Sequence, residues 1–151
     1  ISLTKTGFVI QIHIAAMFLP SLITGSLIKK YGHSKIMYVG VVLFSITIMT
    51  SLFDQNFINY LIALIFLGFG WNFLFISGTS LLILSYNEDE KFKAQGFNDL
   101  IVYTVQAVAS LSAGVFLNLT NWKTMNLICV IFLIIIVIST LRADFAQKKP
   151  Q

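Results

Sequence analysis

Five long stretches of this 151-residue chain are almost free of charged side chains. A helix needs roughly 20 residues to cross a hydrocarbon core of about 30 Å, and each stretch approaches or exceeds that length. The charged residues within them are Lys93, close to one end, and Asp99. The sequence therefore predicts an all-α membrane protein, a bundle of five transmembrane helices. We place the spans near residues 6–28, 36–53, 57–84, 92–117 and 124–141, followed by a basic tail over residues 142–151.

The composition argues against a water-soluble domain and against most other protein classes. Charged residues make up 11% of the chain, whereas a soluble domain carries about 25%. The net charge of +4 comes from short lysine clusters between apolar runs, so we expect no nucleic-acid partner. A single cysteine allows neither a disulfide within the chain nor a cysteine-based metal site. Known catalytic and nucleotide-binding motifs are absent from the sequence, so we expect no enzyme, no metal and no cofactor.

The basic residues predict which way the chain is oriented. Five spans alternate sides, which places Lys5 and Lys123 on one side of the membrane and eight basic residues on the other. These eight are Lys29, Lys30, Lys35, Lys91, Lys93, Arg142, Lys148 and Lys149. Because lysine and arginine are enriched in cytoplasmic loops, we predict a cytoplasmic C-terminus. Ile1 lies almost inside the first span, so we also expect a fragment that lacks at least one preceding helix.

The fourth span carries polar residues along one face. Asp99, Tyr103, Gln106 and Ser110 recur at positions i, i+4, i+7 and i+11, which share one side of a helix. We call these four residues the polar stripe. Polar side chains are costly at membrane depth, so such a stripe either lines a water-filled cavity or bonds to a neighbouring helix. For Asp99 a further alternative is a carboxylate near the interface that reaches water or Lys93.

Two other spans carry polar residues, whereas the second and fifth are almost wholly apolar. Asn72 and Thr79 lie seven residues apart on one face of the third span, and Gln11 and His13 lie in the first. We therefore predict that three helices face a cavity and two face lipid. His13 has the alternative of a buried hydrogen-bonding role, and Pro20 predicts a kink in the first span.

Small residues predict close helix packing in the third and fourth spans. Small side chains spaced four residues apart let a neighbouring helix approach closely. Glycines in a helix that lines a cavity can also permit bending, and this alternative stays open for the pair in the third span. The packing candidates are Gly68, Gly70, Ala109, Ala113 and Gly114.

A basic, glycine-containing loop joins the first two spans, with Gly25, Leu27, Lys30, Gly32 and Lys35 at its defining positions. It resembles the second copy of the loop motif of major facilitator superfamily transporters. The segments Gly68-Phe-Gly-Trp-Asn72 and Ala94-Gln-Gly-Phe-Asn-Asp99 are similar to a bacterial group of that superfamily. The loop departs from the family pattern at Lys29 and His33, which argues against a charge-relay role for it.

The resemblance implies helices eight to twelve of a twelve-helix transporter, part of its C-terminal six-helix bundle, with helix seven and the N-terminal half missing. It also implies that the eighth, tenth and eleventh helices face a central cavity. The expected function is secondary transport of a small solute by alternating access in the bacterial inner membrane, with proton coupling left open. The candidates for the solute cavity or the coupling route are Gln11, His13, Asn72, Thr79, Asp99, Tyr103, Gln106 and Ser110.

Three partners follow from this interpretation: the lipid bilayer, a small-molecule solute and the missing half of the transporter, with protons added if transport is coupled to them. A different class of function also fits the sequence. A small membrane scaffold would use the same polar stripe to bind a partner protein and would transport nothing.

Overall fold

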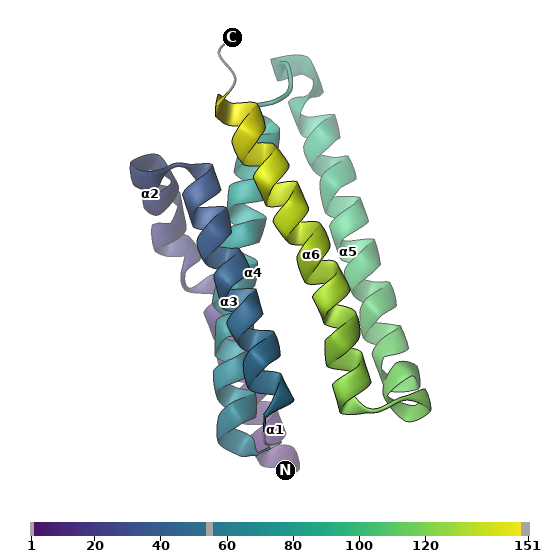
Figure 1. Ribbon diagram of the computed structural model, residues 1–151. Helices are drawn as coiled ribbons and strands as arrows, with labels where there is room; N and C mark the ends of the chain where they lie inside the picture. Colours follow the sequence, from purple (N-terminus) through teal and green to yellow (C-terminus); the bar gives the residue numbers. More distant parts are fainter. Residues whose placement is uncertain (1, 54–55, 149–151) are drawn as a thin grey trace.

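The computed structural model describes residues 2–53 and 56–148, which form six helices (Figure 1). They are α1 (Leu3–Phe18), α2 (Ser21–Tyr31), α3 (His33–Leu52), α4 (Phe57–Ile83), α5 (Glu88–Leu119) and α6 (Trp122–Lys148). With α1 and α2 taken as one span, five helices are long and apolar enough to cross a membrane. The predicted all-α organisation with five membrane helices is confirmed. Lys149 and the rest of the predicted basic tail lie outside the described residues.

The helix ends extend beyond the predicted spans. α5 begins at Glu88, and three acidic residues in its first turn favour that start because they complement the partial positive charge of a helix N-terminus. α6 continues to Lys148, so the described part of the predicted tail is helical. Both extensions carry charged residues, and they place additional helical turns at one end of the bundle beyond the apolar segments.

The first span is broken at Pro20. Proline has no backbone N–H to donate within a helix, and its ring clashes with the preceding turn. α1 therefore ends at Phe18, and α2 starts at Ser21. The predicted kink is thus a break between two helices, and the carbonyl groups at the end of α1 need other hydrogen-bond donors.

α4 is the centre of the best-packed part of the molecule. Its most extensive contacts are with α3 and α1. A Cβ atom added to Gly68 would lie 2.7 Å from the Ala16 Cβ, and one added to Gly70 would lie 2.6 Å from the Phe44 ring. Only glycine permits these distances, so the two residues bring α1 and α3 directly against the α4 backbone.

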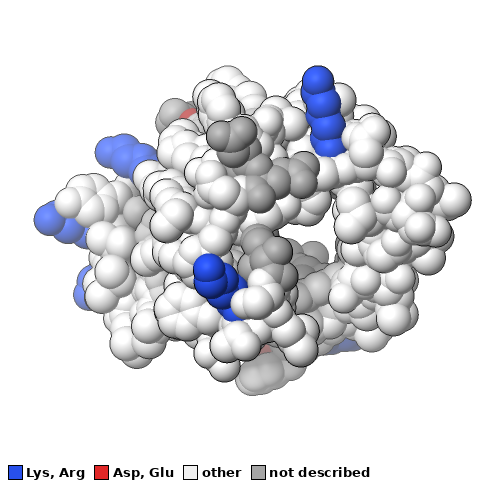
Figure 2. Space-filling view, turned by 90° about the horizontal axis from the view of Figure 1, so that it is seen from below, with Lys and Arg blue, Asp and Glu red and all other residues white. Residues whose placement is uncertain are grey.

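α5 and α6 are more loosely attached. α6 packs along α3, whereas α5 touches α4 and α6 at few points and buries none of its residues. Seen from the end that carries the N-terminus, the space-filling surface is hollowed between the side formed by α1–α4 and the side formed by α5 (Figure 2). A Cβ atom added to Gly114 meets nothing within 4 Å among the described residues, so its packing role stays a prediction.

Because successive helices run in alternating directions, the connections between them lie at alternating ends of the bundle. The α2–α3 turn, the α4–α5 connection and the end of α6 lie together, opposite the N-terminus and the α5–α6 connection (Figure 1). The larger set of basic residues, as far as it is described, therefore lies at one end. Which end faces the cytoplasm stays a prediction.

Candidate functional site

The polar stripe of α5 lies outside the packed core. Tyr103, Gln106 and Ser110 are exposed, and Asp99 is half-buried. The pockets between α5 and its neighbours are lined instead by residues from another side of the helix, among them Val102. The stripe is therefore available to water, to a solute or to protein from outside this chain.

Neutral amides hold the Asp99 carboxylate. Its Oδ1 accepts hydrogen bonds from Gln95 Nε2 at 3.3 Å and from Asn98 Nδ2 at 3.2 Å. Among the described residues the salt bridge is between Lys91 and Glu88, so Asp99 forms no ion pair there with Lys93. The Gln95 Oε1 atom is buried without a hydrogen-bond partner. The Asp99 carboxylate thus has no positively charged partner among the described residues. One helical turn away, the Gln95 Oε1 atom has no hydrogen-bond donor among them.

Asn72 bridges the break in the first span to α4. It is 2% exposed, its Nδ2 donates to the Met17 carbonyl at 2.7 Å, and its Oδ1 accepts from Thr24 Oγ1 at 2.7 Å. Met17 belongs to the last turn of α1, whose carbonyls lack helix partners. Asn72 thus satisfies a polar group that the break exposes. That Asn72 also lines a solute cavity stays a prediction.

His13 also connects α1 to α4. Its Nδ1 lies 2.7 Å from the Leu64 carbonyl oxygen. A carbonyl oxygen can only accept a hydrogen bond, so Nδ1 carries the proton in this contact. This contact agrees with the alternative that His13 serves as a hydrogen-bonding residue between helices. Gln11 lies on the exposed side of α1.

Thr79 lines a pocket of about 320 Å³ between α4, α5 and the neighbouring helices. Asn98 of α5 lines the same pocket, as do Trp71 and Phe75, whose rings stack at 4.5 Å. The structure therefore brings one predicted site residue, Thr79, close to the Asp99 cluster through Asn98. Reasoning from the sequence missed Asn98, because it lies off the polar stripe. It also missed Thr24, although a hydroxyl four residues after a proline is a recognisable signal.

The predicted loop is mostly helical: Gly25, Leu27 and Lys30 lie in α2, Lys35 lies in α3, and Gly32 forms the turn between these helices. Gly32 has φ +88°, a conformation that side chains other than glycine rarely adopt, which explains the glycine at this position. Polar contacts tie the following residues to other helices: His33 Nε2 lies 3.1 Å from Ser80 Oγ, and Gln147 Nε2 donates to Ser34 Oγ at 2.8 Å. The turn is therefore anchored to both α4 and α6. The remaining motif residues, Gly25, Leu27, Lys30 and Lys35, are exposed or half-buried.

Comparison with known proteins identifies the family. The sequence pattern of the Major Facilitator Superfamily matches residues 1–151. The chain belongs to the major facilitator superfamily. It is 42% identical over 117 residues to the riboflavin transporter RfnT of Brucella anthropi and 32% identical over 127 residues to the uncharacterized transporter YddS of Bacillus subtilis. No solved structure matches it.

The matches cover most of this chain but a small part of its relatives. They include 78% and 83% of the chain, and 29% of the length of each relative. The chain thus corresponds to a segment of a longer transporter in these proteins. Superfamily membership together with five apolar helices makes it a multi-pass membrane protein of a transporter family.

Proposed function

We propose that the chain supplies helices eight to twelve of a secondary transporter that moves a small solute by alternating access across the bacterial inner membrane. The observation that carries this proposal is α5, a 32-residue helix with no buried residue and with a polar stripe inside a segment apolar enough to cross a membrane. Ionisable and polar side chains that face lipid are unfavourable, so the stripe needs water or protein beside it. A transporter provides both along the path between its two halves.

The missing half of the transporter is the partner that this arrangement requires. In transporters built from repeated bundles, the solute site lies near the membrane midplane between the bundles. The exposed sides of α5 and α1, with the polar stripe and Gln11, are the surfaces that would face this site. Proton coupling would use Asp99, the single carboxylate within the five predicted spans.

We infer a flavin-like solute as the most specific substrate class. The Brucella anthropi relative is a riboflavin transporter by name. Riboflavin is a planar aromatic ring system with amide-like edges and a hydroxylated chain. Such a solute suits aromatic and amide side chains placed together, and the polar stripe offers Tyr103 and Gln106 three residues apart. The stacked pair of Trp71 and Phe75 provides a separate aromatic surface, in the pocket that Asn98 and Thr79 also line.

A chimera tests the transport function and the substrate separately. This chain replaces the matching stretch of the Brucella anthropi transporter, and riboflavin uptake is measured in a riboflavin-requiring bacterium. We expect uptake above that of cells without the transporter, and none from this chain expressed alone. A chimera that inserts at normal levels but takes up neither riboflavin nor any solute of a broad panel would favour the scaffold alternative. Uptake of a different solute would overturn the flavin assignment alone.

The orientation has its own test. The proposal places the end with most basic residues in the cytoplasm. A reporter that is active only in the cytoplasm should therefore work when fused after Lys30 or Lys91 and fail when fused after Lys123. The reverse pattern would overturn the orientation without affecting the transport proposal.

A further inference from the structure

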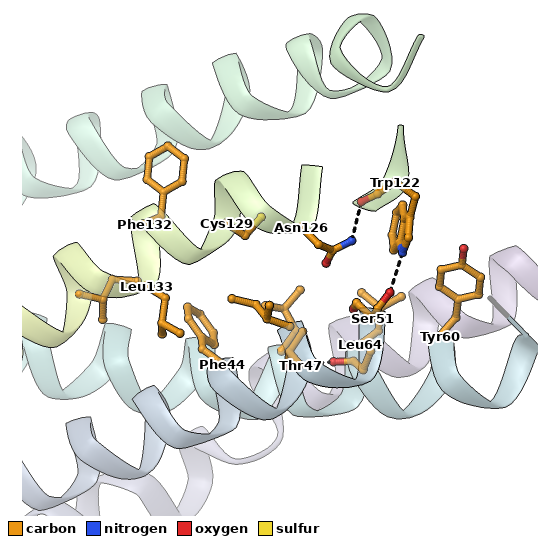
Figure 3. A pocket seen from close by; sticks show the side chains of 14 residues that line it. Phe44, Thr47, Ser51, Tyr60, Leu64, Trp122, Asn126, Cys129, Phe132 and Leu133 are labelled. Carbon is orange, nitrogen blue, oxygen red and sulfur yellow. Dashed lines mark hydrogen bonds between the residues drawn. The ribbon is translucent and has the colours of Figure 1, made fainter. Parts of the chain in front are cut away.

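A cavity of about 320 Å³ lies between α3, α4 and α6, away from the polar stripe (Figure 3). Most of its wall is apolar, and its few polar side chains gather toward one end. Figure 3 shows Phe44, Phe132 and Leu133 at one end and Tyr60 and Trp122 at the other. The cavity is therefore apolar over most of its length and has polar side chains at the end beside Trp122.

At the polar end of the cavity, the side chains of Trp122 and Asn126 form hydrogen bonds. Trp122 Nε1 donates to the Ser51 carbonyl at 2.8 Å, and the Tyr60 ring meets the Trp122 ring edge-on at 5.4 Å. Asn126 lines the cavity, and its Nδ2 donates to the Trp122 carbonyl at 2.9 Å. A carbonyl oxygen on the Asn126 amide keeps further hydrogen-bonding capacity. Tryptophan and tyrosine favour the level of the lipid headgroups.

The cavity has the depth of one leaflet. It follows α6 from Trp122 to Ile136, which is about 21 Å at 1.5 Å per residue. α3 lines it with residues from its last turns and α4 with residues from its first turns. Half of a hydrocarbon core is about 15 Å, to which the headgroup region adds. The cavity thus extends from the interface on the side of the α5–α6 connection toward the middle of the membrane.

We infer that this cavity binds one acyl chain of a phospholipid from that leaflet, with the glycerol ester region beside Trp122 and Asn126. Water is a poor occupant because the inner part offers it no polar partners. An empty cavity would forfeit the dispersion contacts of its lining. A phospholipid supplies an apolar chain and a polar ester region at the depths where the wall is apolar and polar. Among the described residues α6 packs mainly on α3 and touches α5 at few points, which leaves the cavity a route to the bilayer.

Cys129 provides a test because it is the single cysteine of the chain and lines the cavity, although the residue is exposed and also borders the pocket between α5 and α6. The purified chain, stripped of lipid in a short-chain detergent, is treated with N-phenylmaleimide with and without added phosphatidylglycerol. We expect phosphatidylglycerol to slow the alkylation of Cys129 several-fold and glycerophosphoglycerol, which has no acyl chains, to leave the rate unchanged. No slowing by the phospholipid, or equal slowing by the headgroup alone, would overturn the inference.

A matched control separates the cavity from general immersion in lipid. In a Cys129→Ser background, Ile131→Cys places the thiol at a position that lines neither the cavity nor the pocket between α5 and α6, and Ile131 is 59% exposed. The two positions lie about 3 Å apart along the helix axis. The control thiol should show no selective protection by phosphatidylglycerol. Protection of both thiols to the same extent would contradict a specific site.

A second measurement tests the occupant without cysteine chemistry. Ala63 lines the cavity and is 4% exposed, so Ala63→Leu would fill part of the space. Native mass spectrometry of the parent chain should show one retained phospholipid, and the Ala63→Leu variant should lose it. A parent that retains none, or a folded variant that retains as much as the parent, would overturn the inference. If the variant does not fold, the Cys129 rates still decide.

Discussion

α4 and α5 are both long membrane helices with polar residues, yet they use them in opposite ways. α4 buries Asn72 and Ser77 among its neighbours and places Gly68 and Gly70 at close backbone contacts. α5 buries no residue and exposes most of its polar stripe. The difference indicates that α4 holds this chain together, whereas the polar side of α5 serves contacts outside it. Four pairs of substitutions follow, ordered by their expected effect on the free energy of unfolding; three test this division and one tests the attachment of α6 to α3.

The largest effect is expected from crowding the α1–α4 contact. Gly68→Val places a branched side chain where a single Cβ atom would already lie 2.7 Å from the Ala16 Cβ and 2.9 Å from the His13 carbonyl. Overpacking of this kind destabilises by about 1–3 kcal/mol. Gly114→Val is the matched control in α5, where nothing described lies within 4 Å. Detergent-induced unfolding should show a large loss for Gly68→Val and almost none for Gly114→Val. Equal losses would contradict the division between the two helices.

The next effect comes from the buried amide of α4. Asn72→Leu removes the donor to the Met17 carbonyl and one of two acceptors of Thr24 Oγ1, which can still donate to the Pro20 carbonyl at 2.8 Å. Buried groups left without partners are destabilising by about 1–3 kcal/mol, although measured values for side-chain bonds in membranes average about 0.6 kcal/mol. We expect a loss of about 1 kcal/mol by detergent unfolding. Gln106→Leu in α5 should leave stability unchanged but impair uptake by the chimera. A stable Asn72→Leu variant with impaired uptake would place Asn72 in the solute path instead.

The sequence was sufficient to predict five long apolar helices and a departure from regular helix at Pro20, which the structure shows as a break. These features depend on local periodicity and on the covalent geometry of proline. It could not distinguish Asn72 from Asp99, because both are polar residues in apolar runs. The difference depends on tertiary contacts: Asn72 meets a carbonyl 55 positions away in the chain, whereas Asp99 meets only amides of its own helix. Likewise, glycines of α4 and α5 look alike in sequence, but Gly68 and Gly70 lie close to other helices, whereas a Cβ atom added to Gly114 meets nothing within 4 Å among the described residues.

A smaller effect is expected where α6 joins α3. Trp122→Phe removes the hydrogen bond from Nε1 to the Ser51 carbonyl but keeps an aromatic ring beside Tyr60. Side-chain hydrogen bonds in membranes contribute about 0.6 kcal/mol on average, so detergent unfolding should show a loss of about that size. Trp71→Phe is the control, because the structure gives the Trp71 indole a stacking contact with Phe75 that phenylalanine can retain. If both variants lose the same stability, the bond to Ser51 is not what attaches α6.

The smallest effect on stability is expected at Asp99, where the division between the helices predicts a loss of function without a loss of fold. Asp99→Asn keeps the shape of the side chain, and its amide oxygen can still accept hydrogen bonds from Gln95 and Asn98. What it loses is the ability to ionise. In the chimera, we expect unchanged unfolding and expression, with gradient-driven accumulation of solute abolished and exchange of solute across the membrane retained. Asp99→Glu, which restores a carboxylate at slightly longer reach, serves as the control and should recover part of the accumulation. An Asn variant that accumulates solute as well as the parent at every pH tested would make Asp99 a packing or interfacial residue, and any coupling group would then lie elsewhere in the transporter.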